Sequence, residues 1–337
     1  MADGGEGTLA AFVSAFPNAT RVPVTVEGPD GRHRASEWVL LPDGTGIVEL
    51  ASTSGIMLMD RLRPLTAHTR GLGQAIASAL DHGVVRLIVA LGGSSSTDGG
   101  AGALTELGAK FTSVDESATP DGNRGLGFIH RADLSGLRPL PPLGVTILTD
   151  VTNPLLGSTG AARVFGAQKG ASEGDIQTME DNLGRFASLI PVEPATVGSG
   201  AAGGTAFGLL AWGAEIAWGA PAVGEVLGLA DTLRAADVLV TGEGCFDSQS
   251  EMGKVPSYVL DVAHRLGRRT LLVAGRIDAS TDAYADSVSL TELAGSQLAA
   301  QSSALYWLEA AGAHVATRLP DSGLGEGRST RARGVQG

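Results

Sequence analysis

The sequence predicts an α/β protein with two domains. A chain of 337 residues is long enough for two domains, each with a core of its own. Hydrophobic residues make up 43% of it, aromatic residues only 4%, and there are 49 glycines, which suits cores of Ala, Val, Leu and Ile joined by many close turns. Short apolar runs are repeatedly followed by Gly-rich polar turns and then by helical spacing, the pattern of strands that lead into helices.

Charge and cysteine content narrow the class of protein. The formal net charge of −12 leaves no basic surface for a nucleic acid, although backbone amides and a metal ion can still hold a nucleotide. The single cysteine, Cys245, excludes an internal disulfide framework and fits a reducing cytoplasm. The acidic start does not resemble a signal peptide, and glycines interrupt the longest uncharged run, residues 194–214, so we expect no membrane span.

The N-terminal part of the chain begins with a polar turn and continues into a meander. The turn, residues 3–8, is followed by an expected helix over 8–15. Apolar and polar residues then alternate between 21 and 51, and Pro, Gly and Asp turns divide this stretch into antiparallel strands. Residues 66–82 have the spacing of an amphipathic helix.

The stretch over residues 84–111 is the most informative part of the sequence. An expected buried strand over 87–91 precedes a turn of glycines, hydroxyls and one carboxylate over 92–100, and helical spacing follows. Such a turn lets backbone N–H groups approach an anion, and the helix N-terminus favours negative charge. A tight turn capped by Asp98 or Thr97 explains this stretch alone equally well.

The rest of the chain alternates short apolar runs with amphipathic segments. Residues 115–138 are expected to form a polar loop, and 296–319 a helix. The apolar stripe of that helix is expected to be Leu298, Leu305, Leu308 and Ala311. The other expected strands are 143–148, 236–240, 270–273 and 287–290, and the other expected helices are the second half of 194–214, 175–189 and 256–266.

Four expected strands end in loops rich in Gly, Asp, Ser, Thr and Asn. Because ligands of α/β sheets bind at the carboxyl ends of strands, these loops predict a ligand site. Carboxylates among glycine turns suit Mg²⁺ that bridges to phosphate. Taken singly, Asp3 and Asp98 are explained more simply as caps or turn residues. The carboxylates of the set are Asp3, Glu6, Asp98, Asp150, Glu243 and Asp247.

Other chemistries fit the sequence poorly. The six histidines include no i,i+4 pair, which disfavours a zinc site, and neither a GxSxG elbow nor a GxxxxGK[ST] loop occurs. Cys245 has no histidine nearby in the sequence and is better explained as a packing residue. Lys254 is the best-placed cation for a phosphate or carboxylate and Lys169 is the second, although a solvated surface lysine explains either equally well.

Five motifs resemble those of the type I glycerate kinases, in the same order and spacing. They are MADGGEGT, LGGSSSTDGGAG, TDVTNPL with the downstream GAQKGA, GAAGGTAFGLLAW and TGEGCFDSQSEMGKVP. The resemblance covers residues 1 to about 320 and implies ATP-dependent phosphorylation of D-glycerate, generally on its 2-hydroxyl, with Mg²⁺. Cys245–Phe246 depart from the Arg–Ile pair that is more usual in the family.

The same resemblance implies two α/β domains with the active site in the cleft between them. One is a split flavodoxin-like (Rossmann-like) domain made of residues 1–13 and 225–320, and the other is an inserted α/β domain over 14–224 that contains the meander. Relatives carry a first strand before the acidic turn, whereas Met1 lies inside the motif here, so we expect the split domain to be incomplete. Residues 321–337 are expected to form a disordered tail.

The loops and the resemblance together assign roles to individual residues. Asp247 or Asp98 is expected to be the catalytic base and Lys254 a charge-balancing cation. Asp150, Glu243 or Asp247 is expected to bind Mg²⁺, directly or through water. The residues expected to bind substrate or phosphate are Asp3, Gly4, Gly5, Glu6, Gly92, Gly93, Ser94, Ser95, Ser96, Thr97, Asn153, Gly242, Gly244, Ser248 and Gln249.

Two further classes of protein remain open on the sequence. A small-molecule binding protein that is impaired in catalysis would keep the same loops. An NAD-dependent oxidoreductase would use glycine turns for pyrophosphate, but it predicts a strand followed by GxGxxG, which we do not find. The expected ligands are glycerate and ATP with Mg²⁺, and a homodimer is compatible with the sequence.

Overall fold

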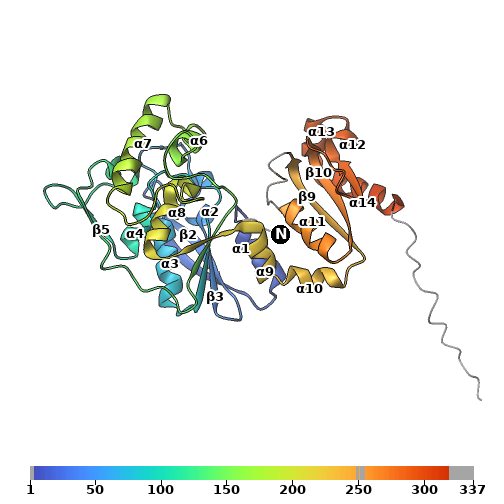
Figure 1. Ribbon diagram of the computed structural model, residues 1–337, viewed down its shortest axis with the longest axis horizontal. Coiled ribbons are helices and arrows are strands. Elements are labelled where there is room, and N and C mark those ends of the chain that lie inside the picture. The colour runs from blue at the N-terminus through green and yellow to red at the C-terminus, as the bar shows by residue number, and fades with distance from the viewer. Residues whose placement is uncertain (1–3, 248–249, 251–254, 319–337) are drawn as a thin grey trace, which may run out of the picture. The chain divides into compact units, whose positions relative to one another are not determined.

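The computed structural model describes residues 4–247, 250 and 255–318. By their internal contacts the residues form two compact units, Met1–Thr232 with Gly253–Tyr258, and Leu233–Met252 with Val259–Gly337 (Figure 1). Each unit has a β-sheet with helices packed against it, so the predicted α/β class is confirmed. The expected tail over residues 321–337 lies outside the described residues.

The first unit is built on a six-stranded sheet in the order β1-β2-β3-β4-β7-β8. Strands β1 to β3 form the predicted antiparallel meander, and β3, β4, β7 and β8 run parallel. β8 has no sequence signal, because four residues are too few to show a period. The strands are β1 (Thr20–Glu27), β2 (His33–Leu40), β3 (Thr45–Glu49), β4 (Arg86–Ala90), β7 (Val145–Thr149) and β8 (Glu215–Trp218).

Alternate residues of the strands are buried against helices on opposite faces of this sheet. Leu87 and Val89 of β4 belong to a core that also contains residues of α3 (Arg70–Asp81), α4 (Ala101–Glu106) and α8 (Ala201–Trp212). Ile88 belongs to a separate core, where it joins Phe12 of α1 (Thr8–Ala15) and Val223 of α9 (Gly219–Val226). Both faces of β4 are therefore covered, which explains why its sequence is a continuous apolar run. Figure 1 shows α1 and α9 beside this sheet.

The helices of the first unit confirm the expected helical segments, with ends shifted by a few residues. The segment 115–138 is not an uninterrupted loop, because it contains α5 and β6. None of the described helices has the length and apolar character that crossing a membrane requires. These elements are α1 (Thr8–Ala15), α2 (Leu50–Ser54), η1 (Ile56–Leu58), α3 (Arg70–Asp81), α4 (Ala101–Glu106), β5 (Lys110–Thr112), α5 (Gly122–Leu126), β6 (Arg131–Asp133), α6 (Ala161–Phe165), η2 (Ala167–Lys169), α7 (Glu173–Ala187), α8 (Ala201–Trp212), α9 (Gly219–Val226) and α10 (Leu229–Arg234).

The second unit has a parallel three-stranded sheet in the order β11-β10-β9. Leu271 of β10 packs in a core with Ala300 and Ala311, and Leu272 packs in a different core with Leu260. Its elements are β9 (Val238–Phe246), α11 (Val255–Arg265), β10 (Arg269–Ile277), β11 (Asp286–Ser289), α12 (Leu290–Ala294), α13 (Gln297–Ser302) and α14 (Ala304–Arg318).

The expected end of β9 at Val240 is wrong. The strand continues through the glycines to Phe246, so this motif is extended backbone and not a loop. A Cβ on Gly242 would lie 1.8 Å from the carbonyl oxygen of Val273 in β10. Glycine is therefore required here because the two strands approach closely, and not because the strand ends.

The expected apolar stripe of the C-terminal helical segment is also wrong in part. The segment is divided into α13 and α14, and Leu298 and Leu305 are 78% and 80% exposed. Leu308 is exposed as well, whereas Ala311 is fully buried. The break between the two helices changes the phase of the helical period, so residues in one predicted stripe do not share one buried face.

Gly92 offers a test of how closely the N-terminal turn packs on the loop after β4. Its amide donates to the carbonyl oxygen of Gly4, and a Cβ on Gly92 would lie 2.3 Å from the Cα of Gly5. We expect Gly92→Ala to lower the free energy of unfolding by roughly 1–3 kcal/mol, the usual cost of overpacking. Urea unfolding followed by circular dichroism measures it. Gly174→Ala is the control, because its Cβ would meet nothing closer than 3.9 Å; equal losses in both variants would contradict the packing argument.

Candidate functional site

A cavity of about 350 Å³ lies at the carboxyl ends of β4 and β7 in the first unit, and we call it the glycine pocket. It combines the N-terminal turn with the loops that follow the two strands. Parallel strands end at the same edge of a sheet, which is why motifs far apart in the sequence meet here. Its lining includes Gly4, Gly92, Gly93, Ser94, Asp150 and Lys169.

Lys169 of η2 is a buried cation in the wall of the glycine pocket. Its side chain is almost fully enclosed, and its Nζ donates to Ser94 Oγ at 2.8 Å and to the carbonyl oxygen of Ser96 at 2.5 Å. Among the described residues, no carboxylate forms an ion pair with it. Burial lowers the pKa of Lys169 from 10.5 to about 7, and the attraction of the Asp98 carboxylate opposes this only in part.

A strained segment of α8 packs directly on Lys169. Ala202, Gly203 and Gly204 have φ values of 53°, 66° and 84°, so three consecutive residues adopt the left-handed conformation. A Cβ on Gly203 would lie 2.1 Å from the carbonyl oxygen of Ser96 and 2.9 Å from Lys169 Nζ. Glycine is required at this close approach. The left-handed alanine costs on the order of 1–3 kcal/mol, and such strain concentrates at functional sites.

Asp98 lies beneath the pocket and is fully buried. Its carboxylate accepts hydrogen bonds from Thr69 N and Oγ1 at 2.9 and 2.8 Å, and from the amides of Gly100 and Gly102 at 3.3 Å. These donors hold the first turn of α4 against the start of α3. The geometry favours the capping explanation of Asp98 over its expected role as a base, because the carboxylate is enclosed and already accepts four hydrogen bonds.

The loop after β4 offers fewer open donors than the sequence suggests. The amides of Gly92 and Ser95 donate to carbonyl oxygens of the N-terminal turn and of α2, at 2.8 and 3.2 Å. The buried hydroxyls of Ser96 and Thr97 have no hydrogen-bond partner among the described residues. Ser94 is the member of the loop whose hydroxyl meets Lys169, so these two side chains are the polar centre of the glycine pocket.

A second cavity, of about 670 Å³, lies in the second unit, and we call it the β9 pocket. Gly242, Glu243 and Gly244 line it, and Glu243 Oε1 is buried without a partner among the described residues. Arg276 of β10 also lines it, with Nη2 3.5 Å from Cys245 Sγ and an ion pair to the carboxylate of Asp278. Arg276 is not among the expected site residues. The expected end of this strand at Val273 is wrong, because β10 continues to Ile277 and contains Arg276.

The expected site residues are divided between the two units. Those from 4 to 153 lie in the first, and those from 242 to 247 lie in the second. The expected residues that are described but line neither pocket are Gly5, Glu6, Ser95, Ser96, Thr97, Asp98, Asn153 and Asp247. The expected residues Asp3, Ser248, Gln249 and Lys254 lie outside the described residues.

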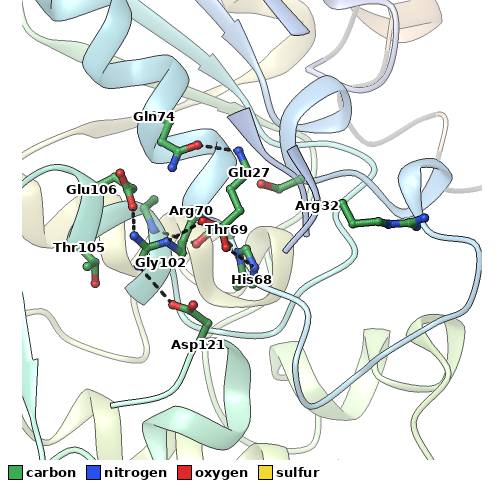
Figure 2. Close-up of polar contacts among 12 residues, drawn as sticks. Glu27, Arg32, His68, Thr69, Arg70, Gln74, Gly102, Thr105, Glu106 and Asp121 are labelled. Atoms are coloured by element: carbon green, nitrogen blue, oxygen red, sulfur yellow. Dashed lines mark hydrogen bonds and ion pairs between the residues drawn. The ribbon is translucent and has the colours of Figure 1, made fainter. Parts of the chain in front are cut away.

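A third polar cluster surrounds Arg70 at the start of α3 (Figure 2). Its guanidinium forms ion pairs with Glu27, Glu106 and Asp121, and His68 Nε2 lies 3.5 Å from Glu27 Oε1. Ligand atoms of Glu27, His68 and Asp121 lie within 4.8 Å of one another, as metal ligands do. Arg70 already supplies positive charge there. We therefore assign this cluster the structural role of joining β1 to the starts of α3 and α5 and to α4.

The fold and the buried lysine define the class of protein: an α/β protein with a sheet-edge pocket suited to a small anion. Residues 1–319 match the model of the family described as the glycerate kinase family. The chain is 39% identical to glycerate 2-kinase of Escherichia coli K12 over 287 residues, which cover 82% of this chain and 75% of that protein.

Further relatives agree with this match. A glycerate kinase of Bacillus subtilis is 36% identical over 295 residues, covering 84% of this chain and 76% of that protein. A solved structure from Salmonella typhimurium LT2, assigned there as glycerate kinase 2, superimposes with a TM-score of 0.77 at 36% identity and covers 86% and 79% of the two chains. The chain belongs to the glycerate kinase family, and its enzyme class is that of the kinases.

The role of Asp98 can be tested through stability. Asp98→Asn replaces one carboxylate oxygen with an NH₂ group, which cannot accept the hydrogen bonds that Asp98 now receives. We therefore expect the free energy of unfolding to fall by roughly 2–4 kcal/mol. Asp81→Asn is the control, since Asp81 is exposed and makes an ion pair with Arg138; its effect should stay within about 0.5 kcal/mol. A fully stable Asp98→Asn protein without turnover would instead support a catalytic base.

The burial of Lys169 makes stability depend on pH. The pKa is 10.5 in the unfolded chain and about 7 in the folded one, so between these values the unfolded state binds more protons. The contribution of this group to the free energy of unfolding is thus least favourable below pH 7 and improves as the pH rises towards 10. Urea unfolding should show Lys169→Met more stable than wild type below pH 7, with the difference narrowing by about pH 9.5. A difference independent of pH would show that the amine is not held in its buried environment.

Proposed function

We propose that this protein transfers a phosphoryl group from ATP to the 2-hydroxyl of D-glycerate, giving 2-phosphoglycerate and ADP. Family membership and relatives named glycerate kinase or glycerate 2-kinase support this proposal. The observation that carries it is the glycine pocket, where Gly4, Gly92 to Ser94 and Asp150, from three separate motifs, surround a buried lysine. Such a pocket is built for an anion, as both a phosphate and the carboxylate of glycerate are.

An enzyme catalyses phosphoryl transfer mainly by positioning the two substrates and by neutralising the negative charge on the phosphate oxygens, and much less by covalent chemistry of its own. In the proposed reaction the glycerate hydroxyl oxygen bonds to the γ-phosphorus while the bond from that phosphorus to the bridging oxygen breaks, and ADP leaves. The hydroxyl proton passes to Asp247, which we retain as the base because Asp98 is enclosed by its own donors. Lys254, outside the described residues, keeps its proposed role of balancing charge.

The nucleotide and its Mg²⁺ are proposed to use the carboxylates and glycine amides of the motifs. The unpartnered, buried Oε1 of Glu243 fits a hard-cation ligand, and Asp150 at the glycine pocket is the second proposed ligand. Mg²⁺ would neutralise charge on the phosphate oxygens. The exposed backbone at Gly242 and Gly244 is proposed to donate to phosphate.

The finer domain organisation belongs to the same proposal. It comprises a split flavodoxin-like domain from residues 1–13 and 225–320 without its first strand, an inserted domain over 14–224, and a cleft between the two. A cytoplasmic location and a homodimer are part of it as well. Limited proteolysis with mass spectrometry maps the domain boundaries independently of activity.

A coupled assay tests the reaction. Purified protein with D-glycerate, ATP and Mg²⁺ should release ADP, and enolase should accept the product directly, because enolase uses 2-phosphoglycerate and not the 3-isomer. Asp247→Asn should lower turnover by at least about 100-fold, the lower end of the range for a lost acid–base group. Asp261→Asn, an exposed position of α11, is the control. Near-wild-type turnover in Asp247→Asn removes Asp247 from the mechanism, and binding of glycerate without ADP release identifies a binding protein.

A further inference from the structure

Lys169 and Ser94 decide which anion the glycine pocket takes. We propose that Lys169 Nζ and the Ser94 hydroxyl bind the carboxylate of the hydroxy-acid substrate, so that this pocket is the acid site and not the site of the triphosphate. The inference rests on the proposed function, because it names the part of that substrate which this pocket recognises. Lys169 is thereby the residue that selects an acid over a neutral polyol.

The environment of Lys169 lacks the negative charge that a buried ammonium requires. Nζ meets one hydroxyl and one carbonyl oxygen, and no ion pair joins it to a carboxylate of the described residues. Asp98 acts on it from a distance, and its oxygens are taken by four other donors. The neighbouring helix α6 packs against η2, and its Arg163 forms an ion pair with Glu173, so this carboxylate is paired with Arg163 and not with Lys169. A buried charge without a partner is costly, and a bound carboxylate would supply the partner.

The charge and size of the pocket favour a small monoanion. Of the described residues that line it, the charged ones are Lys169 and Asp150, one of each sign. A triphosphate would bring several negative charges to the single lysine among the described residues of this lining. A three-carbon acid brings one negative charge, and its hydroxyls can donate to Asp150. The volume of about 350 Å³ lies at the lower end of the range for ligand pockets, which suits the smaller molecule.

The surrounding backbone holds the lysine in place for this task. The left-handed segment at Ala202 and Gly203 closes over Nζ, and the absence of a Cβ at Gly203 leaves the room that the amine occupies. Ser94 is fixed in turn by the bridge between its backbone and Gly55. Two donors set rigidly at one wall of a pocket bind a carboxylate with little loss of conformational entropy.

Steady-state kinetics with matched substrates test the proposal. We expect Lys169→Met to raise the KM for D-glycerate by about 10- to 100-fold, the loss of one charge-assisted contact. The KM for MgATP should stay within about twofold, and so should the KM for glyceramide, the neutral amide of glycerate. Lys110→Met is the control, because Lys110 is exposed on β5. An unchanged KM for glycerate overturns the proposal, and a KM that rises for MgATP alone assigns the pocket to phosphate.

Calorimetry separates a failure of this inference from a failure of the proposed function. D-Glycerate is titrated at about pH 8 into protein loaded with Mg²⁺ and a non-hydrolysable ATP analogue, in two buffers of different ionisation enthalpy. Because the pKa of Lys169 is about 7 before binding, wild type should take up nearly one proton per glycerate, and Lys169→Met should take up none.

Calorimetry and the kinetic assay together distinguish the possible outcomes. Proton-linked binding without ADP release in the assay removes the kinase proposal and leaves the acid site standing. ADP release with an unaltered glycerate KM in Lys169→Met removes the acid site alone. Absence of glycerate binding to wild type, or binding without proton uptake in both proteins, overturns the assignment of Lys169. Unfolding curves of Lys169→Met show whether the variant is folded; Ser94→Ala, with an expected rise in glycerate KM of several-fold, provides a second variant that keeps the lysine.

Discussion

The buried carboxylate of Asp98 is the interaction on which the site of the first unit depends. A carboxylate away from water is tolerated only where donors surround it, and here Thr69 and the first turn of α4 supply them. This requirement fixes the loop after β4 relative to the starts of both helices. The fixed loop then presents the Ser94 hydroxyl and the Ser96 carbonyl oxygen to Lys169. One structural carboxylate thus positions the polar groups of the glycine pocket.

Lys169 and Ala202 are two places where the first unit departs from the rules that give a stable fold. One is a buried amine without an ionic partner, and the other is a non-glycine residue in the left-handed conformation. Both lie at the same pocket. Glu116 is also left-handed and does not line this pocket, whereas the start of α7 follows local rules in the capping box of Ser172 and Asp175. Proteins retain destabilising features of this kind where activity requires them, and the coincidence of these two supports the role proposed for the glycine pocket.

The two units carry cavities of different chemistry. The glycine pocket is small and centred on a lysine and a hydroxyl, whereas the β9 pocket is larger and includes a carboxylate and Arg276. A kinase has to bind a small acceptor and a large, highly charged donor, and these needs differ in size and charge. The two pockets of the described residues differ in both respects.

By itself the sequence determined the α/β class, the meander, strands β4 and β7, and the motifs that indicate the family, because periodicity and spacing are local properties. It did not determine the environment of Lys169. A Gly-Ala-Gln-Lys-Gly turn is compatible with a solvated lysine, and only the packing of Gly203 against the amine shows that it is buried. It offered capping as one explanation of Asp98 but did not identify the partner Thr69, which is 29 residues away. Nor did it show that Gly242 continues a strand. Burial and hydrogen-bond partners arise from contacts between distant residues, so only the tertiary structure decided them.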